Sequence, residues 1–141
     1  MTGAAFAALP NATVVVTGTI PGVCHFDTVP AINLNLDPAA GTPVTASAGL
    51  TFWCTNGNTW ALSDPIGNTG TYAGTLACIT AGTCGANTIG YTLTYDNITG
   101  GPTAGRTDVK TSNLTATVPL VNFQNLPVGT YSQNVVFTIA P

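Results

Sequence analysis

The chain has 141 residues, the usual size of a single domain, and its only charged residues are two Lys or Arg and five Asp. Two basic residues cannot build the Lys and Arg surface that neutralises phosphate groups, which excludes nucleic acid and anionic membranes as partners. A content of 45% hydrophobic residues excludes an intrinsically disordered chain. A chain with so few charges repels other copies only weakly and risks association, which is tolerable if association is its purpose.

The start of the chain is short and apolar. Residues 1–12 lack the basic beginning and the full apolar stretch of a secretory signal, so we interpret them as the start of a secreted chain trimmed near its cleavage site. No apolar run in the sequence approaches the roughly 20 residues that span a bilayer. We therefore expect an extracellular protein without a membrane span.

Four cysteines form an even set, which in a secreted chain predicts two disulfides. Cys78 and Cys84 enclose a turn-like stretch and are suited to a local bond, which would leave Cys24 and Cys54 as a longer one. The spacing alone leaves all three pairings open. A zinc site is the alternative, but the chain has no CxxC motif and one histidine, so we expect no metal.

Short period-two stretches rich in β-branched and aromatic residues recur along the chain, separated by Gly, Pro, Asn and Asp. This pattern is typical of an antiparallel β-sandwich or barrel. No segment has a convincing helical period. In chain order, we predict strands at residues 13–20, 31–36, 49–55, 59–63, 71–78, 88–95, 114–121 and 130–139.

Both ends of the chain are predicted to be strands with one apolar face. Residues 13–20 place threonine at 13, 17 and 19 and Val14, Val16 and Ile20 at the alternate positions. The last predicted strand alternates in the same way through Val135, Phe137 and Ile139. Each end therefore needs an apolar surface to cover one of its faces.

Residues suited to catalysis are few. Asp37 and Asp64 each precede a proline, and Asp96 precedes an asparagine, so these carboxylates are expected to cap turns. His25 stands two residues before Asp27, but no serine occurs in a nucleophile-elbow pattern. We expect no catalytic residue, no cofactor and no enzyme activity.

The two tryptophans suggest different surroundings. Trp53 adjoins Cys54 and is expected in the core beside a disulfide. Trp60 suits either the core or the surface, and with Tyr72 it could form an exposed platform for a sugar ring.

Three N-glycosylation sequons begin at Asn11, Asn97 and Asn113. Threonine and asparagine are so abundant in this chain that chance matches are expected. The sequons matter only if the source modifies surface proteins at asparagine.

Three segments together resemble the spore coat U domain family, which includes pilins of the archaic chaperone-usher pathway. A first strand ends in Cys24, a second cysteine follows about thirty residues later, and a Gly-Thr-Tyr sequence opens the last strand. Residues 91–96 are similar to that family's middle strand. The likeness covers roughly residues 13–141 through the segments 19–24 (TIPGVC), 50–55 (LTFWCT) and 128–132 (VGTYS).

The resemblance implies an immunoglobulin-like antiparallel β-sandwich that lacks one strand and is completed by a donor strand from a neighbouring subunit. Residues 1–18 would be the N-terminal extension that supplies this strand, and residues 19–141 would be the pilin-like domain. Cys24 and Cys54 match the disulfide that ties the family's first strand to its second. The donor contacts would come from Phe6, Leu9, Val14 and Val16.

The implied function is that of a structural subunit in a surface filament that supports adhesion or biofilm. Its partners would be copies of itself in a homopolymer and, during assembly, a periplasmic chaperone and an outer-membrane usher. The alternative is a secreted carbohydrate-binding or adhesive tip domain that uses Trp60 and Tyr72. The second cysteine pair, Cys78 and Cys84, and the near absence of charge depart from the family pattern.

Overall fold

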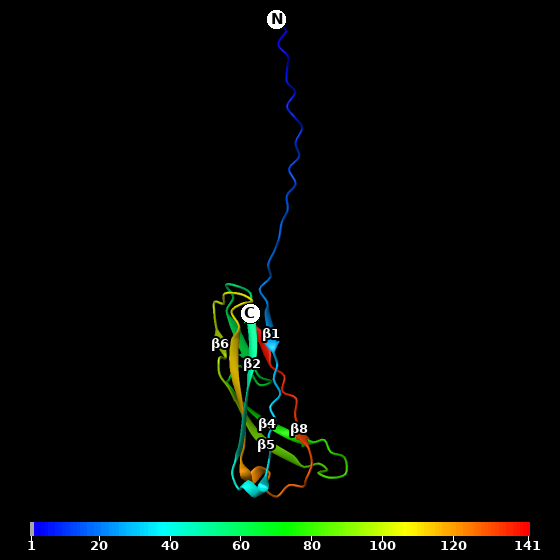
Figure 1. Cartoon of the computed structure of the whole chain (residues 1–141), viewed down its shortest axis with the longest axis vertical. Coiled ribbons are helices and arrows are strands. Elements are labelled where there is room, and N and C mark those ends of the chain that lie inside the picture. The colour runs from blue at the N-terminus through cyan, green and yellow to red at the C-terminus, as the bar shows by residue number, and fades with distance from the viewer. Residues whose placement is uncertain (1) are drawn as a thin grey trace.

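Two antiparallel sheets form the body of the protein, and a long extension precedes them (Figure 1). The computed structural model describes residues 2–141 and confirms the predicted all-β class. The 3-10 turns are η1 (Pro38–Ala40) and η2 (Leu120–Asn122). The strands are β1 (Cys24–Thr28), β2 (Val44–Cys54), β3 (Trp60–Ser63), β4 (Thr71–Cys78), β5 (Thr88–Tyr95), β6 (Thr99–Gly100), β7 (Lys110–Val118), β8 (Tyr131–Ser132) and β9 (Thr138–Ala140).

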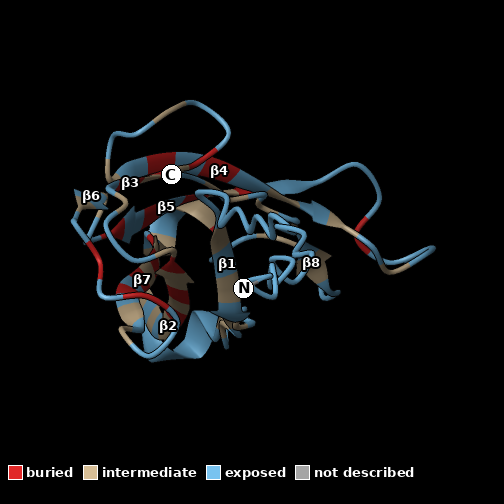
Figure 2. Ribbon diagram, turned by 90° about the horizontal axis from the view of Figure 1, so that it is seen from above, coloured by how far each residue is buried: buried red, intermediate tan, exposed pale blue. Residues whose placement is uncertain are grey.

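The larger sheet has six strands in the order β1-β2-β7-β5-β4-β8, and the smaller sheet has the order β6-β3-β9. Every pair of neighbouring strands is antiparallel. Seen from above, the larger sheet curls into half of a barrel whose open side lies between β1 and β8 (Figure 2). Its two edge strands therefore stand on either side of an opening.

The core lies inside this curl, because β2, β5 and β7 each place apolar side chains at alternate positions toward it. Burying one such side chain contributes about 1.5–3 kcal/mol. The smaller sheet covers the upper end of the core with Trp60 and Leu62. The largest contributions from the six-stranded sheet come from Leu50, Phe52, Ile89, Leu93, Leu114 and Val118.

The N-terminal extension, residues 2–22, is exposed along its whole length and contains no strand. It runs straight away from the body along the long axis of the molecule (Figure 1). The strand predicted at residues 13–20 is therefore wrong for the isolated chain. Its period-two pattern is present, but no neighbouring backbone forms hydrogen bonds with it.

Two other predicted strands do not form as predicted, and two more are displaced, because β2 and β7 begin five and four residues before the predicted strands at 49–55 and 114–121. Residues 31–36 are extended without sheet pairing, and the predicted strand 130–139 is divided into β8 and β9 by the unpaired residues 133–137. The predictions at 71–78 and 88–95 are confirmed as β4 and β5. The two unpaired segments of the body, 31–36 and 133–137, border the open side of the curl.

Both disulfides are present, and together they use all four cysteines. Cys24 and Cys54 are direct partners in the register of β1 with β2, and their bond spans 30 positions. Cys78 and Cys84 close a loop directly after β4. The pairing agrees with the local bond suggested by the spacing.

Candidate functional site

The open side of the curl has two unpaired edges. Residues 29–34 follow β1, residues 133–137 separate β8 from β9, and neither stretch forms a backbone-to-backbone hydrogen bond within the described chain. Water must satisfy these groups in the isolated subunit. Edges of this kind accept an additional strand readily.

An apolar groove lies between the two edges. Its upper part has a cavity volume of about 610 Å³, and its lower part has one of about 650 Å³. Ile32 and Leu34 line one wall, and Val135 and Phe137 line the opposite wall of the upper part. The floor comes from core side chains of the large sheet, namely Leu50, Leu76, Leu93, Leu114 and Ala116.

The rim at Gln133 is fastened to the sheet by its side chain. Oε1 accepts hydrogen bonds from the Tyr91 hydroxyl at 2.8 Å and from the Thr75 backbone N–H at 3.0 Å. Nε2 donates to the Tyr72 hydroxyl at 3.0 Å. The Gln133 side chain thus takes the Thr75 N–H of β4, which would otherwise be available to pair with a longer β8. Residues 133–137 leave the sheet at this point.

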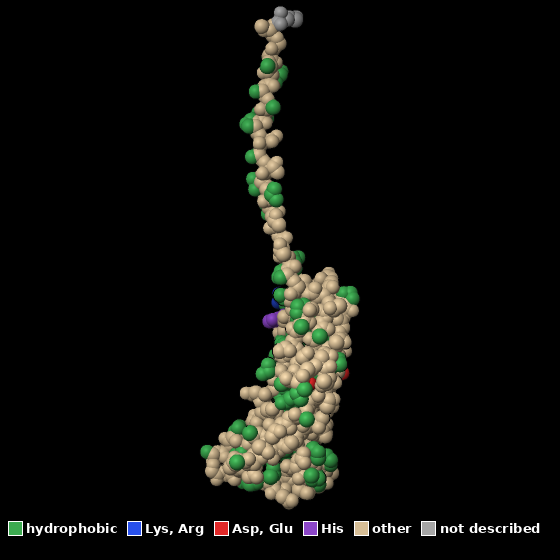
Figure 3. Space-filling model, turned by 180° about the vertical axis from the view of Figure 1, so that it is seen from behind, with side chains coloured by type: hydrophobic (Ala, Val, Ile, Leu, Met, Phe, Trp, Pro, Cys, Tyr) green, Lys and Arg blue, Asp and Glu red, His purple; other side chains and the backbone are tan. Residues whose placement is uncertain are grey.

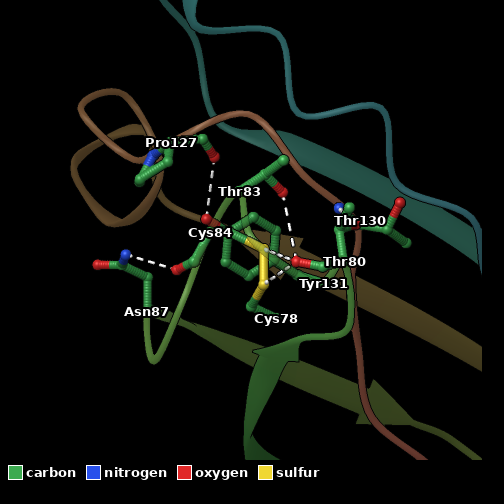
Figure 4. The surroundings of a disulfide bond; sticks show 8 residues. All are labelled: Cys78, Thr80, Thr83, Cys84, Asn87, Pro127, Thr130 and Tyr131. Carbon is green, nitrogen blue, oxygen red and sulfur yellow. Dashed lines mark hydrogen bonds between the residues drawn. A yellow bond between two sulfur atoms is a disulfide. The ribbon is translucent and has the colours of Figure 1, made fainter.

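The lower end of the same rim rests on the Cys78–Cys84 disulfide (Figure 4). A Cβ on Gly129 would lie only 2.5 Å from Cys84 Sγ, so the backbone packs directly on the sulfur. The Thr130 N–H donates to Thr80 Oγ1 at 2.8 Å. The second disulfide therefore holds the chain that enters β8.

The extension carries the predicted donor residues, all of them exposed. Phe6, Leu9, Val14 and Val16 contact no part of the body, and they are more than 80% exposed. Figure 3 shows hydrophobic side chains spaced along the extension. The structure does not bring these residues to the groove of their own chain.

The expected platform of Trp60 and Tyr72 is wrong, because both side chains are buried, at 6% and 9% exposure. Trp60 packs edge-on against Phe52, and the Tyr72 hydroxyl accepts a hydrogen bond from Gln133. Trp53 was expected in the core but lies on the outer face of β2. The alternation along β2 contains this signal, because Phe52 and Cys54 both point inward.

Trp53 has two polar neighbours. The His25 ring lies 5.7 Å from it across β1 and β2, and the Arg106 guanidinium lies 6.0 Å from the indole centroid. The second geometry is a cation–π contact of the kind worth about 0.5–1 kcal/mol at an exposed site.

The three sequons differ in their surroundings. The Asn97 side-chain amide donates to the Thr111 carbonyl, and that of Asn113 donates to Asp96 Oδ2 at 3.0 Å. Asn11 lies on the exposed extension. A glycan at Asn97 or Asn113 would have to replace a hydrogen bond, and one at Asn11 would not.

The buried carboxylate of Asp64 organises a turn. Burial raises its pKa, but hydrogen bonds from the Ile66 and Gly67 backbone N–H groups, the Tyr95 hydroxyl and the Thr69 hydroxyl outweigh burial and hold the pKa below its ordinary 3.8. An ionised carboxylate with this many donors stabilises the loop after β3. Its arrangement is that of a cap, as the sequence predicted.

Within residues 2–141, no three His, Cys, Asp or Glu side chains converge as metal ligands would. The same residues include no helix long and apolar enough to cross a membrane.

No protein-family model, curated protein or solved structure gives a significant match to this chain.

Proposed function

We propose that this chain is the subunit of an extracellular filament in which the extension of one copy fills the groove of the next. The inserted segment would pair with residues 29–34 on one side and 133–137 on the other, and it would complete an immunoglobulin-like sandwich. The observation that carries the proposal is a groove with two unpaired edges and an unpaired apolar extension in one chain.

Residues 12–20 are the segment that fits best. The even positions of this stretch are small or apolar, and the odd positions are mostly threonine. The even positions carry Ala12, Val14, Val16, Gly18 and Ile20, and the odd positions carry Thr13, Val15, Thr17 and Thr19. At about 3.3 Å per residue its length is roughly 30 Å, against roughly 26 Å for residues 29–36, which comprise the unpaired edge at 29–34 and the two residues after it. Phe6 and Leu9 lie before Pro10, which lacks a backbone donor, and would contact the partner beyond this segment.

The direction of insertion decides whether the assembly is open or closed. The extension points along the long axis away from the body (Figure 1), and seen along that axis it lies over the opening between β1 and β8 (Figure 2). A second copy shifted along the axis would receive the extension antiparallel to its residues 133–137. Donor and acceptor surfaces then lie at different ends of each copy, so the contact repeats without closing.

Secretion and assembly partners follow from the same features. Two disulfides form and persist in an oxidising compartment, which supports an extracellular location. A subunit with an empty apolar groove is prone to aggregate before assembly. A periplasmic chaperone that occupies the groove and an outer-membrane usher that exchanges it for an extension would meet this need.

The alternative of a carbohydrate-binding tip domain is not supported, because the two residues expected to contact the sugar are buried. Trp60 and Tyr72 have no exposed ring face for a sugar. Adhesion or biofilm support then belongs to the filament as a whole.

Electron microscopy of the full chain tests the proposal with two variants that carry the same charge. Val16→Asp would place a carboxylate in the apolar groove, and Thr17→Asp would place it on the other face of the inserted strand. We expect thin filaments from the native chain and from Thr17→Asp, and none from Val16→Asp or from a chain that lacks residues 1–20.

A synthetic peptide of residues 10–22 in excess should shorten native filaments by occupying free grooves. Filaments from the truncated chain, or equal assembly of both aspartate variants, would refute the proposal.

A further inference from the structure

The point where the extension leaves the body is fixed by Thr55. Its Oγ1 accepts a hydrogen bond from the Val23 N–H at 3.0 Å and lies 3.0 Å from the Pro21 carbonyl oxygen, to which it can donate. The Thr55 N–H donates to the Val23 carbonyl at 2.8 Å. Residues 21–23 are therefore held as a continuation of β1.

The same residues have the composition of a tight turn. Ile20-Pro21-Gly22-Val23 places proline and glycine at the two central positions that a type II turn favours, and that turn needs a positive φ at the glycine. Gly22 has no positive φ in the structure. Its backbone packs on Asn58, because a Cβ there would lie 2.6 Å from Asn58 Nδ2. The chain is thus held extended where its sequence would permit reversal.

A reversal at this turn would also present the wrong face of the extension. Ile20 would lie opposite Val23, so Thr19 would lie opposite Cys24 and Thr17 opposite Phe26. Opposite residues share a face of the sheet, and the face of Cys24 and Phe26 is the one that points to the core.

The apolar positions of the extension would then point to solvent. Val16 would stand opposite the exposed Asp27, and Gly18 would stand opposite the exposed His25. A shift of register by one residue is needed to correct this, and a two-residue turn cannot supply it. The tight turn therefore opposes filling of the groove by the chain's own extension.

We infer that the junction at residues 21–23 denies the extension its own groove and reserves it for a second copy of the chain. This inference rests on the proposed function. Thr55 acts as the positioning residue, because its contacts direct the extension outward along the axis. Without the junction, the effective concentration of a tethered strand, in the millimolar range for a short flexible tether, would favour self-filling over assembly.

Two insertions of the same six Gly and Ser residues test the inference in the full chain. Placed between Gly22 and Val23, the insert frees the extension to reverse its direction and to change its register against the groove of its own chain. We therefore expect monomers at micromolar concentration, with slow amide exchange in residues 12–20. Placed between Leu9 and Pro10, it lengthens the extension by the same amount and leaves the junction intact, so filaments are expected. Sedimentation velocity and hydrogen exchange give both readouts.

The outcomes separate this inference from the proposed function. Filaments from both insertion variants, or a native chain that is monomeric with residues 12–20 protected, would overturn the role of the junction while the groove still binds the extension. A native chain that is monomeric with residues 12–20 unprotected would overturn the proposed function and, with it, this inference.

Thr55 itself is tested by two substitutions. Thr55→Val keeps the shape and removes the hydroxyl, and Thr55→Ser keeps the hydroxyl. We expect the Val23 amide to exchange about tenfold faster in Thr55→Val than in the native chain, and at the native rate in Thr55→Ser. Equal exchange in all three chains would show that Thr55 does not hold the junction.

Discussion

The hydroxyl of Tyr91 donates a 2.8 Å hydrogen bond to Oε1 of Gln133 and thereby joins the floor of the groove to its rim. The same oxygen accepts from the Thr75 N–H of β4, the strand that neighbours Tyr91 in the sheet. One amide side chain therefore replaces the backbone pairing that ends with β8. The rim stays in place although residues 133–137 have no strand partner.

Replacing Gln133 should loosen this rim. Gln133→Ala leaves the Thr75 N–H and the Tyr91 hydroxyl without their acceptor in a partly buried place, so we expect a loss of about 1–3 kcal/mol in the free energy of unfolding. Urea denaturation of the full chain measures it. Asn134→Ala, at the exposed neighbouring position, should stay within about 0.5 kcal/mol of the native chain. Equal effects of the two substitutions would show that the Gln133 contacts contribute no stability.

Tyr91 should make the protein less stable in alkali. Burial, with a smaller contribution from the nearby Tyr72, raises the pKa of Tyr91 from 10.0 to about 12. The unfolded chain releases this proton near pH 10 and the folded chain keeps it to about pH 12. The free energy of unfolding should therefore fall as pH rises through this window, by roughly 2 kcal/mol once the about 2.7 kcal/mol of a two-unit shift is reduced for solvent screening.

The control for this pH dependence is Tyr91→Phe. Because this variant also loses the hydrogen bond to Gln133, the comparison uses the slope of the unfolding free energy against pH and not its absolute value. Burial first, and then a hydrogen bond to Asp64, raise the pKa of Tyr95 as well, so a smaller slope should remain in the variant. Unfolding measured from pH 8 to 11 should show the reduced slope. An unchanged slope would mean that Tyr91 titrates alike in the folded and unfolded chains.

Two glycines on paired strands should respond in opposite ways to alanine. A Cβ on Gly74 would lie 2.3 Å from Tyr91 Cζ, so Gly74→Ala forces the ring to move and should cost about 1–3 kcal/mol. A Cβ on Gly90 would meet Asn122 Nδ2 at an ordinary 3.4 Å, so Gly90→Ala should be neutral or stabilising by up to about 1 kcal/mol. Thermal unfolding of both variants compares them directly, and a stable Gly74→Ala chain would contradict the packing described for Tyr91.

Alternation in the sequence predicted the central strands well because these strands find their partners within the chain. β4 and β5 were predicted with the observed ends, and their inward residues form the core. Residues 13–20 and 31–36 have the same alternation and form no strand. Period two identifies an apolar face, but it does not reveal whether a neighbouring backbone exists, so the groove could not be located from the sequence.

The error over the tryptophans has a different cause. Trp53 was placed in the core because it adjoins Cys54, but adjacent residues of a strand point to opposite faces. Cys54 points inward to meet Cys24, so Trp53 must point outward. Trp60 begins β3, a strand of four residues, where the pattern was too short to decide its face.

The two disulfides should contribute differently to stability and to the groove. Their loops span 30 and 6 positions, so loop entropy predicts a loss of roughly 3–4 kcal/mol on removing Cys24–Cys54 and of roughly 2 kcal/mol on removing Cys78–Cys84, each by a double serine substitution. Gly129 rests on Cys84, at the lower end of the groove. Removing the second bond should therefore also weaken binding of the peptide of residues 10–22, beyond its effect on unfolding.

Urea denaturation and peptide titration by calorimetry separate the two effects for each double variant. The Cys24→Ser, Cys54→Ser chain should lose more stability yet bind the peptide with nearly native affinity wherever it remains folded, because that bond joins β1 to β2 away from the lower groove. The Cys78→Ser, Cys84→Ser chain should lose less stability and bind the peptide several-fold more weakly. Weaker binding in the first variant alone would show that β1, and not the chain entering β8, controls the shape of the groove.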